Sequence, residues 1–342
     1  MSVDTTIKLP RAFIWRRLHS LMGLWLVLFL MEHLLVNSQA ALLLGDNGRG
    51  FVEMVNGIHN LPYLSFIEFT LLGVPIAIHL IWGVKYLFTA KPNAHKTDGS
   101  TPSLPEYGRN RAYSWQRITS WILLFMLVAH VVKFRFIDYP ASLNIGGDVA
   151  YFAPVKVDNG LYTVADRLKV ALFDKEAIEI EKRSLKDRSD EEALFEAADS
   201  LKKNEILTWD GPASVKYDSQ REVIFTSAQK FQDKINWVKM LGSYSLADDE
   251  VLAVSDNFGT ASLLLVRDTF KSPIYVFLYT IFVLSACFHG FNGLWTFLIT
   301  WGVVLRMSAQ KSTATFAIGL MLLVAFLGLA SIWGTYWLNL RY

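Results

Sequence analysis

The sequence contains one cysteine, Cys287, among 342 residues. A disulfide within the chain, a cysteine-ligated iron–sulfur cluster and the attachment motif of a c-type haem each need more than one cysteine, so all three are excluded. Charged residues are also scarce, at 19%, against about 25% in soluble domains. The net charge is only +2, and we expect no nucleic-acid partner.

Hydrophobic residues, by contrast, make up 52% of the sequence. They are concentrated in five long runs. They cover residues 18–44, 61–90, 115–137, 272–305 and 313–340. About 20 helical residues cross the ~30 Å hydrocarbon core of a bilayer, so we predict an all-α membrane protein with five transmembrane helices. The first run is too long for a signal-peptide core, so no cleavable signal is expected. Pro75 should kink the second helix and free a backbone carbonyl.

Basic residues alternate between the two sides of the predicted bundle. One side carries Lys8, Arg11, Arg16 and Arg17, then Lys85, Lys91, Lys96, Arg109, Arg111 and Arg117, and finally Arg306 and Lys311. The other side carries Arg49 and Arg341. Because short cytoplasmic loops are rich in Lys and Arg, we expect a multi-pass protein with its N-terminus in the cytoplasm and its C-terminus outside.

A polar insert of about 130 residues separates the third and fourth runs. We therefore divide the chain into helices 1–3 (1–139), an extracytoplasmic insert (140–270) and helices 4–5 (271–342). The insert contains no His or Cys. Strand-like stretches at 215–217, 223–226 and 251–254 and a charged helical stretch at 175–203 predict a small α+β domain. Two interpretations of the insert remain open: it recognises a partner, or it is a solvent-exposed elaboration of a loop.

Four histidines each lie inside a different apolar run: His33, His79, His130 and His289. An unpaired imidazole in hydrocarbon costs several kcal/mol, so an intramembrane histidine is a candidate functional residue. With about 1.5 Å of rise per residue, His33 and His130 lie near the outer surface, and the other two lie near the inner surface. Depth therefore predicts two pairs, His33 with His130 and His79 with His289, each suited to hold a haem iron by two axial imidazoles.

Other residue types support close packing and charge binding near these pairs. Gly83, Gly290 and Gly293 lie near predicted ligands and allow helices to approach. His19, with Arg16, Arg17 and Ser20 beside it, is placed at the inner interface, where such a cluster suits haem propionates or a quinone headgroup. His59 and His95 are predicted to be ordinary loop residues.

Four segments together resemble a known family. They are residues 16–23 (RRLHSLMG), 32–37 (EHLLVN), 116–119 (QRIT) and 289–295 (HGFNGLW). They resemble the cytochrome b subunit of succinate dehydrogenase, in the five-helix, two-haem class usually called cytochrome b558, which includes diheme fumarate reductases. The resemblance covers the five runs, whereas the 140–270 insert departs from the shorter family pattern.

The resemblance implies a membrane anchor for a flavoprotein and an iron–sulfur subunit in a bacterial cytoplasmic membrane. Electrons from succinate would pass through two b haems to a quinone, in this class commonly menaquinone, and no succinate-oxidising site is expected on this chain. The family's axial ligands fall on the four histidines of the two pairs. The inner-side contacts fall on His19, Ser20 and Gln116, with Arg17 and Arg117 nearby.

Quinone reduction also needs a titratable group near the outer pair. The candidate acids are Glu32, Glu68 and Glu53, and Lys133 and Arg135 are candidates for holding outer propionates. Two alternatives stay open: an anchor of a quinol:fumarate reductase, and a structural or transport bundle whose histidines are only hydrogen-bonded.

Overall fold

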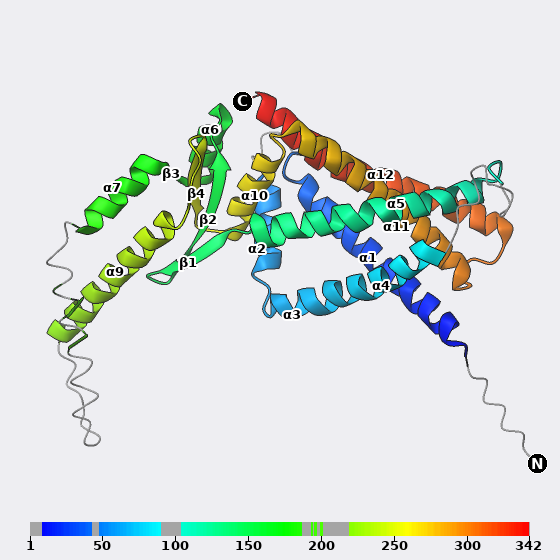
Figure 1. Ribbon diagram of the computed structural model, residues 1–342, viewed down its shortest axis with the longest axis horizontal. Helices are drawn as coiled ribbons and strands as arrows, with labels where there is room; N and C mark the ends of the chain where they lie inside the picture. Colours follow the sequence, from blue (N-terminus) through cyan, green and yellow to red (C-terminus); the bar gives the residue numbers. More distant parts are fainter. Residues whose placement is uncertain are drawn as a thin grey trace, which may run out of the picture. The chain divides into compact units, whose positions relative to one another are not determined.

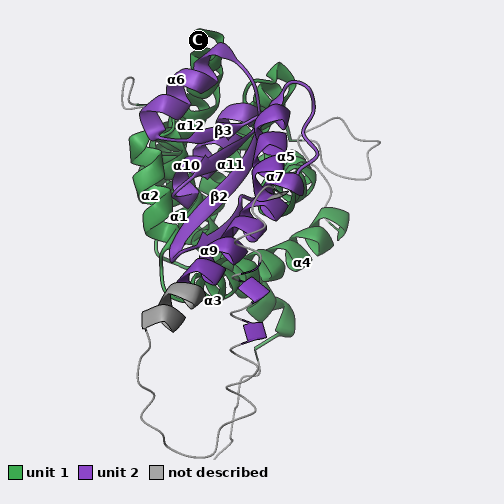
Figure 2. Cartoon of the chain, turned by 90° about the vertical axis from the view of Figure 1, so that its left-hand side faces the viewer, with its two compact units in different colours: residues 1–138, 269–341 green, residues 139–268, 342 purple. Residues whose placement is uncertain are grey.

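The computed structural model describes residues 9–42, 48–89, 104–186 and 219–341, with residues 193, 195, 196, 199 and 200 (Figure 1). Contacts divide the chain into two units, shown in different colours in Figure 2. The first unit is Met1–Asp138 with Thr269–Arg341, and the second is Tyr139–Asp268.

Five helices in the first unit are long and apolar enough to cross a membrane, as the sequence predicted. They are α1 (Arg11–Ser38), the continuous α3–η1–α4 (Leu64–Glu68, Phe69–Gly73, Val74–Thr89), α5–η2 (Gly108–Val132, Lys133–Ile137), α11 (Pro273–Thr300) and α12 (Met307–Arg341). A short helix, α2 (Arg49–His59), lies between the first two. The segments η1 and η2 are single π-helical turns.

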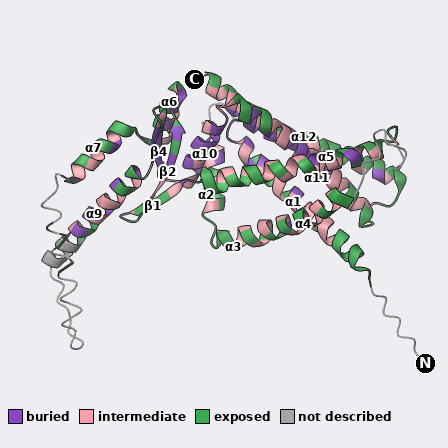
Figure 3. Cartoon of the chain, in the orientation of Figure 1, coloured by how far each residue is buried: buried purple, intermediate pink, exposed green. Residues whose placement is uncertain are grey.

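Helix α1 contacts three of the other long helices: α4, α11 and α12. Small residues allow the close approach of α12, since a Cβ on Gly328 would lie 2.7 Å from Val283 Cγ1 and one on Gly334 would lie 2.9 Å from Ala41 Cβ. Many large apolar side chains of these helices are exposed, including Phe125, Ile274 and Phe326 (Figure 3). Exposed apolar surface on helices of this length suits contact with lipid.

Pro75 has the local effect expected from its sequence position. Proline has no N–H, so the carbonyl four residues earlier, that of Leu71, loses its helical donor. The structure satisfies this oxygen from another helix, because the indole N–H of Trp25 on α1 donates to it. Leu71 lies within the π-turn η1, which ends two residues before Pro75, so the second span is irregular where it meets α1.

The second unit contains a four-stranded antiparallel sheet with strand order β1-β2-β4-β3. The strands are β1 (Ala141–Ile145), β2 (Asp148–Lys156), β3 (Ala171–Phe173) and β4 (Glu250–Ser255). Gly146 and Gly147 form the β1–β2 turn with φ of +60° and +97°, backbone angles that glycine adopts easily and that match the twist of a two-residue hairpin.

Four helices of the second unit cover the two faces of this sheet. They are α6 (Asn159–Leu168), α7 (Lys175–Lys186), α9 (Ser219–Gly242) and α10 (Phe258–Thr269). Alternate residues of β2 enter different cores, as expected for a strand. Ala153 and Val155 pack with residues of α6 and α10, whereas Phe152 packs with residues of α7 and α9.

The strand predictions for this region have three different outcomes. The stretch 251–254 is confirmed as part of β4. The prediction of a strand at 223–226 is wrong, because these residues belong to α9; a run of four residues, three of them apolar, does not distinguish a strand from a helix segment. The stretch 215–217 lies outside the described residues, as does most of 187–203, while 175–186 is helical as predicted.

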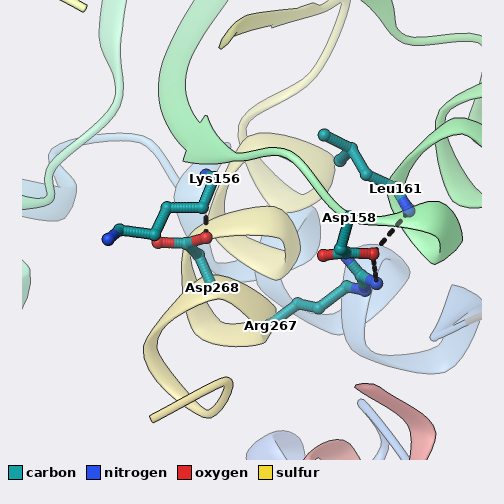
Figure 4. Close-up of polar contacts among 5 residues, drawn as sticks. All are labelled: Lys156, Asp158, Leu161, Arg267 and Asp268. Carbon is teal, nitrogen blue, oxygen red and sulfur yellow. Dashed lines mark hydrogen bonds and ion pairs between the residues drawn. The ribbon is translucent and has the colours of Figure 1, made fainter. Parts of the chain in front are cut away.

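A cluster of polar contacts in the second unit, here called the clasp, was not foreseen from the sequence; it joins residues 156–161 to Arg267 and Asp268 (Figure 4). Asp158 caps α6 by accepting a 2.9 Å hydrogen bond from Leu161 N. Both of its carboxylate oxygens also bind the guanidinium of Arg267, at 2.9 and 2.6 Å. Next to this pair, Lys156 N donates to Asp268 Oδ1 at 2.9 Å. The clasp therefore connects the end of β2 and the start of α6 to α10.

Candidate functional site

The structure brings the four intramembrane histidines together as the two pairs expected from depth. His33 of α1 faces His130 of α5, with ring centroids 5.8 Å apart and planes at 83°. His79 of α4 faces His289 of α11, with centroids 6.2 Å apart and planes at 81°. Each pair therefore joins two different helices through nearly perpendicular imidazoles.

The separation within each pair leaves room for one metal ion. Metal–imidazole bonds are about 2.0–2.1 Å long, so two imidazoles on opposite sides of one ion have ring centroids about 6 Å apart. The observed 5.8 and 6.2 Å fit this arrangement. Among the described residues, no group of three or more His, Cys, Asp or Glu side chains is placed to hold a metal ion, so each pair offers two protein ligands.

We call His79 and His289 the inner pair and His33 and His130 the outer pair, after their predicted depths. Hydrogen bonds at the inner pair fix which ring nitrogens carry protons. His79 Nδ1 lies 3.0 Å from the backbone oxygen of His19. A carbonyl oxygen only accepts, so Nδ1 is the donor and Nε2 keeps its lone pair. Metal-binding histidines are commonly held in this way.

His289 is held by two hydroxyl groups of α5. Its Nδ1 lies 3.4 Å from Ser120 Oγ and 3.5 Å from Thr119 Oγ1. Both hydroxyl groups donate their own protons to backbone carbonyls of Gln116 and Trp115, so they are acceptors toward His289. The Nε2 atom of His289 is therefore also the nitrogen with a free lone pair.

The outer pair has different neighbours. His130 Nδ1 lies 3.2 Å from the hydroxyl oxygen of Tyr279. Asn37 Nδ2 donates a 2.8 Å bond to the backbone oxygen of His33 and lies 3.5 Å from His33 Nε2, which is the outer limit of a hydrogen bond. Phe29, stacked on His33, and Phe282 beside His130 complete an aromatic surround.

His19 lies directly against the inner pair. Its ring stacks on His79 with centroids 4.0 Å apart and planes at 12°, and Tyr86 approaches its edge. The Nδ1 atom of His19 is buried and has no hydrogen-bond partner within the described residues. A buried polar nitrogen without a partner is costly, so this atom indicates a place where a polar group belongs.

Gly23 is an important contact that the sequence reasoning missed. A Cβ at this position would lie 2.9 Å from Cε1 and 3.2 Å from Nδ1 of His79. Of the glycines that were predicted, Gly290 is tight, with its Cβ position 3.3 Å from Val27 Cγ2. Gly83 and Gly293 have only ordinary contacts, at 3.8 and 3.9 Å. The motif at 16–23 contains Gly23, but only the rotation of α1 against α4 shows what it faces.

Gln116, which the resemblance places among the inner-side contacts, lies beside His289. Its amide nitrogen donates to the backbone oxygen of His289 at 3.1 Å, and its amide oxygen accepts from Asn292 Nδ2 at 2.7 Å. This bridge fastens α5 to α11 at the level of the inner pair. Arg117, the next residue, donates to the backbone oxygen of Tyr86 at 2.5 Å.

Arg17 and Ser20 both contact the C-terminal end of α11 or the residue that follows it. Arg17 donates to the backbone oxygen of Thr300, and its guanidinium lies over the rings of Phe13 and Trp301. Ser20 accepts from the indole nitrogen of Trp301 at 2.9 Å. A hollow of about 540 Å³ lies along this face of α1 and is lined by Phe13, Ile14, Arg17, Leu18, Leu21 and Trp301.

The three candidate acids have different surroundings. Glu32 on α1 and Glu53 on α2 are exposed. Glu68 on α3 pairs with Arg135 of η2 at 2.8 Å. His59, at the end of α2, has its pKa lowered by burial, with the charge of Glu68 raising it and that of Arg135 lowering it. Lys133, the other cation predicted to hold a propionate, pairs with Asp138.

Comparison with known proteins gives one informative match. No family model matches the chain, and no solved structure matches it. The succinate dehydrogenase cytochrome b558 subunit of Bacillus subtilis (strain 168) is 34% identical over 126 residues, which is 36% of this chain and 56% of that protein. The chain thus spans just over half the length of this relative. The match confirms that this chain resembles the cytochrome b558 subunit of succinate dehydrogenase, as its sequence motifs predicted.

Proposed function

We propose that this chain is a two-haem cytochrome b anchor of a succinate:quinone oxidoreductase in a bacterial cytoplasmic membrane. The observation that carries the proposal is the pair of opposed imidazoles found twice, with centroids 5.8 and 6.2 Å apart. Two imidazoles joined by a direct ring hydrogen bond of about 3 Å would have centroids about 5.4 Å apart, so the observed separations are wider than direct contact and approach the spacing that one ion between the rings requires. The similarity to a cytochrome b558 subunit supports the same conclusion.

Haem bound at each pair would supply one-electron transfer, and the chain's own residues would hold and orient it. His79 and His289 both present Nε2, because their Nδ1 atoms are engaged by the His19 carbonyl and by Ser120 and Thr119. The unpartnered Nδ1 of His19 is suited to a propionate oxygen. A haem propionate at this place would remove the cost of the buried, unpaired nitrogen.

The helices set the distance between the two levels. On α1, His19 contacts the inner pair and His33 belongs to the outer one, 14 residues apart, or about 21 Å of helix. On α5, Ser120 and His130 mark the same two levels and are ten residues apart, or about 15 Å. These spacings support two separate sites stacked along the bundle.

The inner level would receive electrons from an iron–sulfur subunit that is itself bound to a flavoprotein. This assignment follows from the basic residues predicted on the cytoplasmic side and from the similarity to a succinate dehydrogenase subunit. The second unit would then lie outside, because it connects the outer ends of α5 and α11 in the chain.

Quinone would be reduced at the outer level, with menaquinone as the expected substrate. Its reduction takes up two protons, so it needs a group that can pass protons from water. Glu68 is a candidate because its carboxylate is partly exposed, pairs with Arg135 and lies near the imidazole of His59. Glu32, next to His33 in sequence, and Glu53 remain the other candidates.

A reduced-minus-oxidised spectrum of the purified complex tests the proposal, together with haem quantification per chain. We expect a b-type α band and two haems, with flavin and iron–sulfur subunits in the same preparation. His33→Ala should remove one haem and leave the other, because the inner ligands are on other helices.

The matched control is His59→Ala, a histidine outside both pairs, which should keep two haems. A chain without any b-type band would refute the proposal in favour of a bundle with hydrogen-bonded histidines. The midpoint potentials of the two haems, measured with the native quinone, would separate a succinate dehydrogenase from a fumarate reductase.

A further inference from the structure

Tyr279 on α11 occupies a place beside the outer pair that the proposed function does not use. Only 8% of its surface is exposed, and its ring meets Phe134, Phe270 and Phe282 edge-on. Its hydroxyl oxygen lies 3.2 Å from His130 Nδ1. A phenol in an aromatic setting normally directs its polar end to a partner, and here the partner is a candidate ligand.

The three histidines held through Nδ1 differ in the kind of atom that holds them. His79 faces a backbone carbonyl and His289 faces two aliphatic hydroxyl groups. His130 faces the phenol of Tyr279. The partner of Nδ1 fixes the orientation of a metal-binding imidazole and adjusts how strongly it donates electrons to the metal. The two levels therefore differ in the groups that hold their histidines.

We propose that Tyr279 is a positioning residue, which orients His130 toward His33 and sets the reduction potential of the outer haem separately from the inner one. This inference rests on the proposed function. If Nε2 of His130 binds iron, Nδ1 carries the proton, and the hydroxyl oxygen of Tyr279 accepts a hydrogen bond from Nδ1–H. Accepting this bond makes the imidazole a stronger donor and favours the oxidised form of the iron.

The experiment is a redox titration of the intact complex carrying Tyr279→Phe, which keeps the ring and removes the hydroxyl. The outer haem is identified as the one lost in His33→Ala. We expect the reduction equilibrium of the outer haem to shift about tenfold toward the reduced form, which is about 59 mV for one electron. The inner haem should keep its potential.

Two matched variants show whether the effect is local. Tyr275→Phe removes a hydroxyl one turn away on α11, where the tyrosine ring contacts Lys133, and should change neither potential. Ser120→Ala removes an acceptor of His289 and should shift only the inner haem.

The outcomes separate this inference from the function on which it rests. Two haems with unchanged potentials in Tyr279→Phe, or a shift of the inner haem alone, would overturn the role of Tyr279 and leave the two-haem assignment standing. A wild-type complex without b haem would overturn both. A shift confined to the outer haem, with Tyr275→Phe silent, supports the inference.

Discussion

His79 is held on one side by α1 through two features at the residue scale. The backbone oxygen of His19 accepts from its Nδ1, and Gly23 offers no side chain where the ring lies. A ligand that must keep one rotamer needs both a hydrogen bond and a free space of the right shape. One residue of α1 supplies the bond and another supplies the space.

Gly23→Ala should disturb the inner site selectively. The new Cβ would lie 2.9 Å from His79 Cε1, a distance that forces the ring or the helix to move, and overpacking of this kind costs about 1–3 kcal/mol. Haem quantification and spectra of the purified complex should show loss or distortion of the inner haem with the outer one kept. Gly319→Ala on α12 is the control, since its Cβ would meet nothing within 4 Å. An unchanged inner haem in Gly23→Ala would contradict this prediction and show that α1 shifts to accommodate the added methyl group.

At the scale of elements, the clasp formed by Asp158 and Arg267 ties α6 to α10. Arg267→Ala leaves a partly buried carboxylate without its guanidinium, and we expect the second unit to lose about 3 kcal/mol of stability. Hydrogen exchange of the amides of β2 and α10 in the full protein should become faster. Lys182→Ala is the matched control, because its exposed pair with Glu179 is worth less than about 1 kcal/mol. Equal protection in wild type and Arg267→Ala would mean that the sheet holds without the clasp.

The sequence predicted some elements well because their signals are local. Long apolar runs must become helices in a bilayer, and helix rise alone pairs the four histidines by depth. Residues 223–226, which lie in α9, were predicted as a strand because a run this short, with three apolar residues and a threonine, shows no clear periodicity. The contact between the hydroxyl of Tyr279 and His130 depends on how α11 is rotated about its axis relative to α5. The pattern of residues along the sequence does not determine that rotation, so this contact was not predicted.

At the scale of the whole molecule, the proposed orientation makes quinone reduction depend on the membrane potential. Electrons would move from the inner pair to the outer pair, toward the positive side of an inside-negative membrane. This movement releases about 2.3 kcal/mol per electron per 100 mV for a full crossing, which would help succinate to reduce a low-potential quinone. Collapsing the potential in intact membranes should therefore slow succinate-dependent menaquinone reduction, measured with and without an uncoupler. Turnover that ignores the uncoupler would contradict either the orientation or the outer location of the quinone.

The π-turns η1 and η2 affect the direction in which side chains of the second and third spans point. Glu68 immediately precedes η1 and Arg135 lies within η2, and these two residues form an ion pair. An α-helix turns by about 100° per residue, and a π-turn of five residues covers about the same rotation as four residues of α-helix. Deleting one residue from η1 would therefore restore the regular winding and keep Glu68 in nearly the same direction relative to His79, with its ion pair to Arg135 intact. Deleting one residue from the α-helical part between η1 and His79 would instead turn the carboxylate by roughly 100° and separate it from the guanidinium.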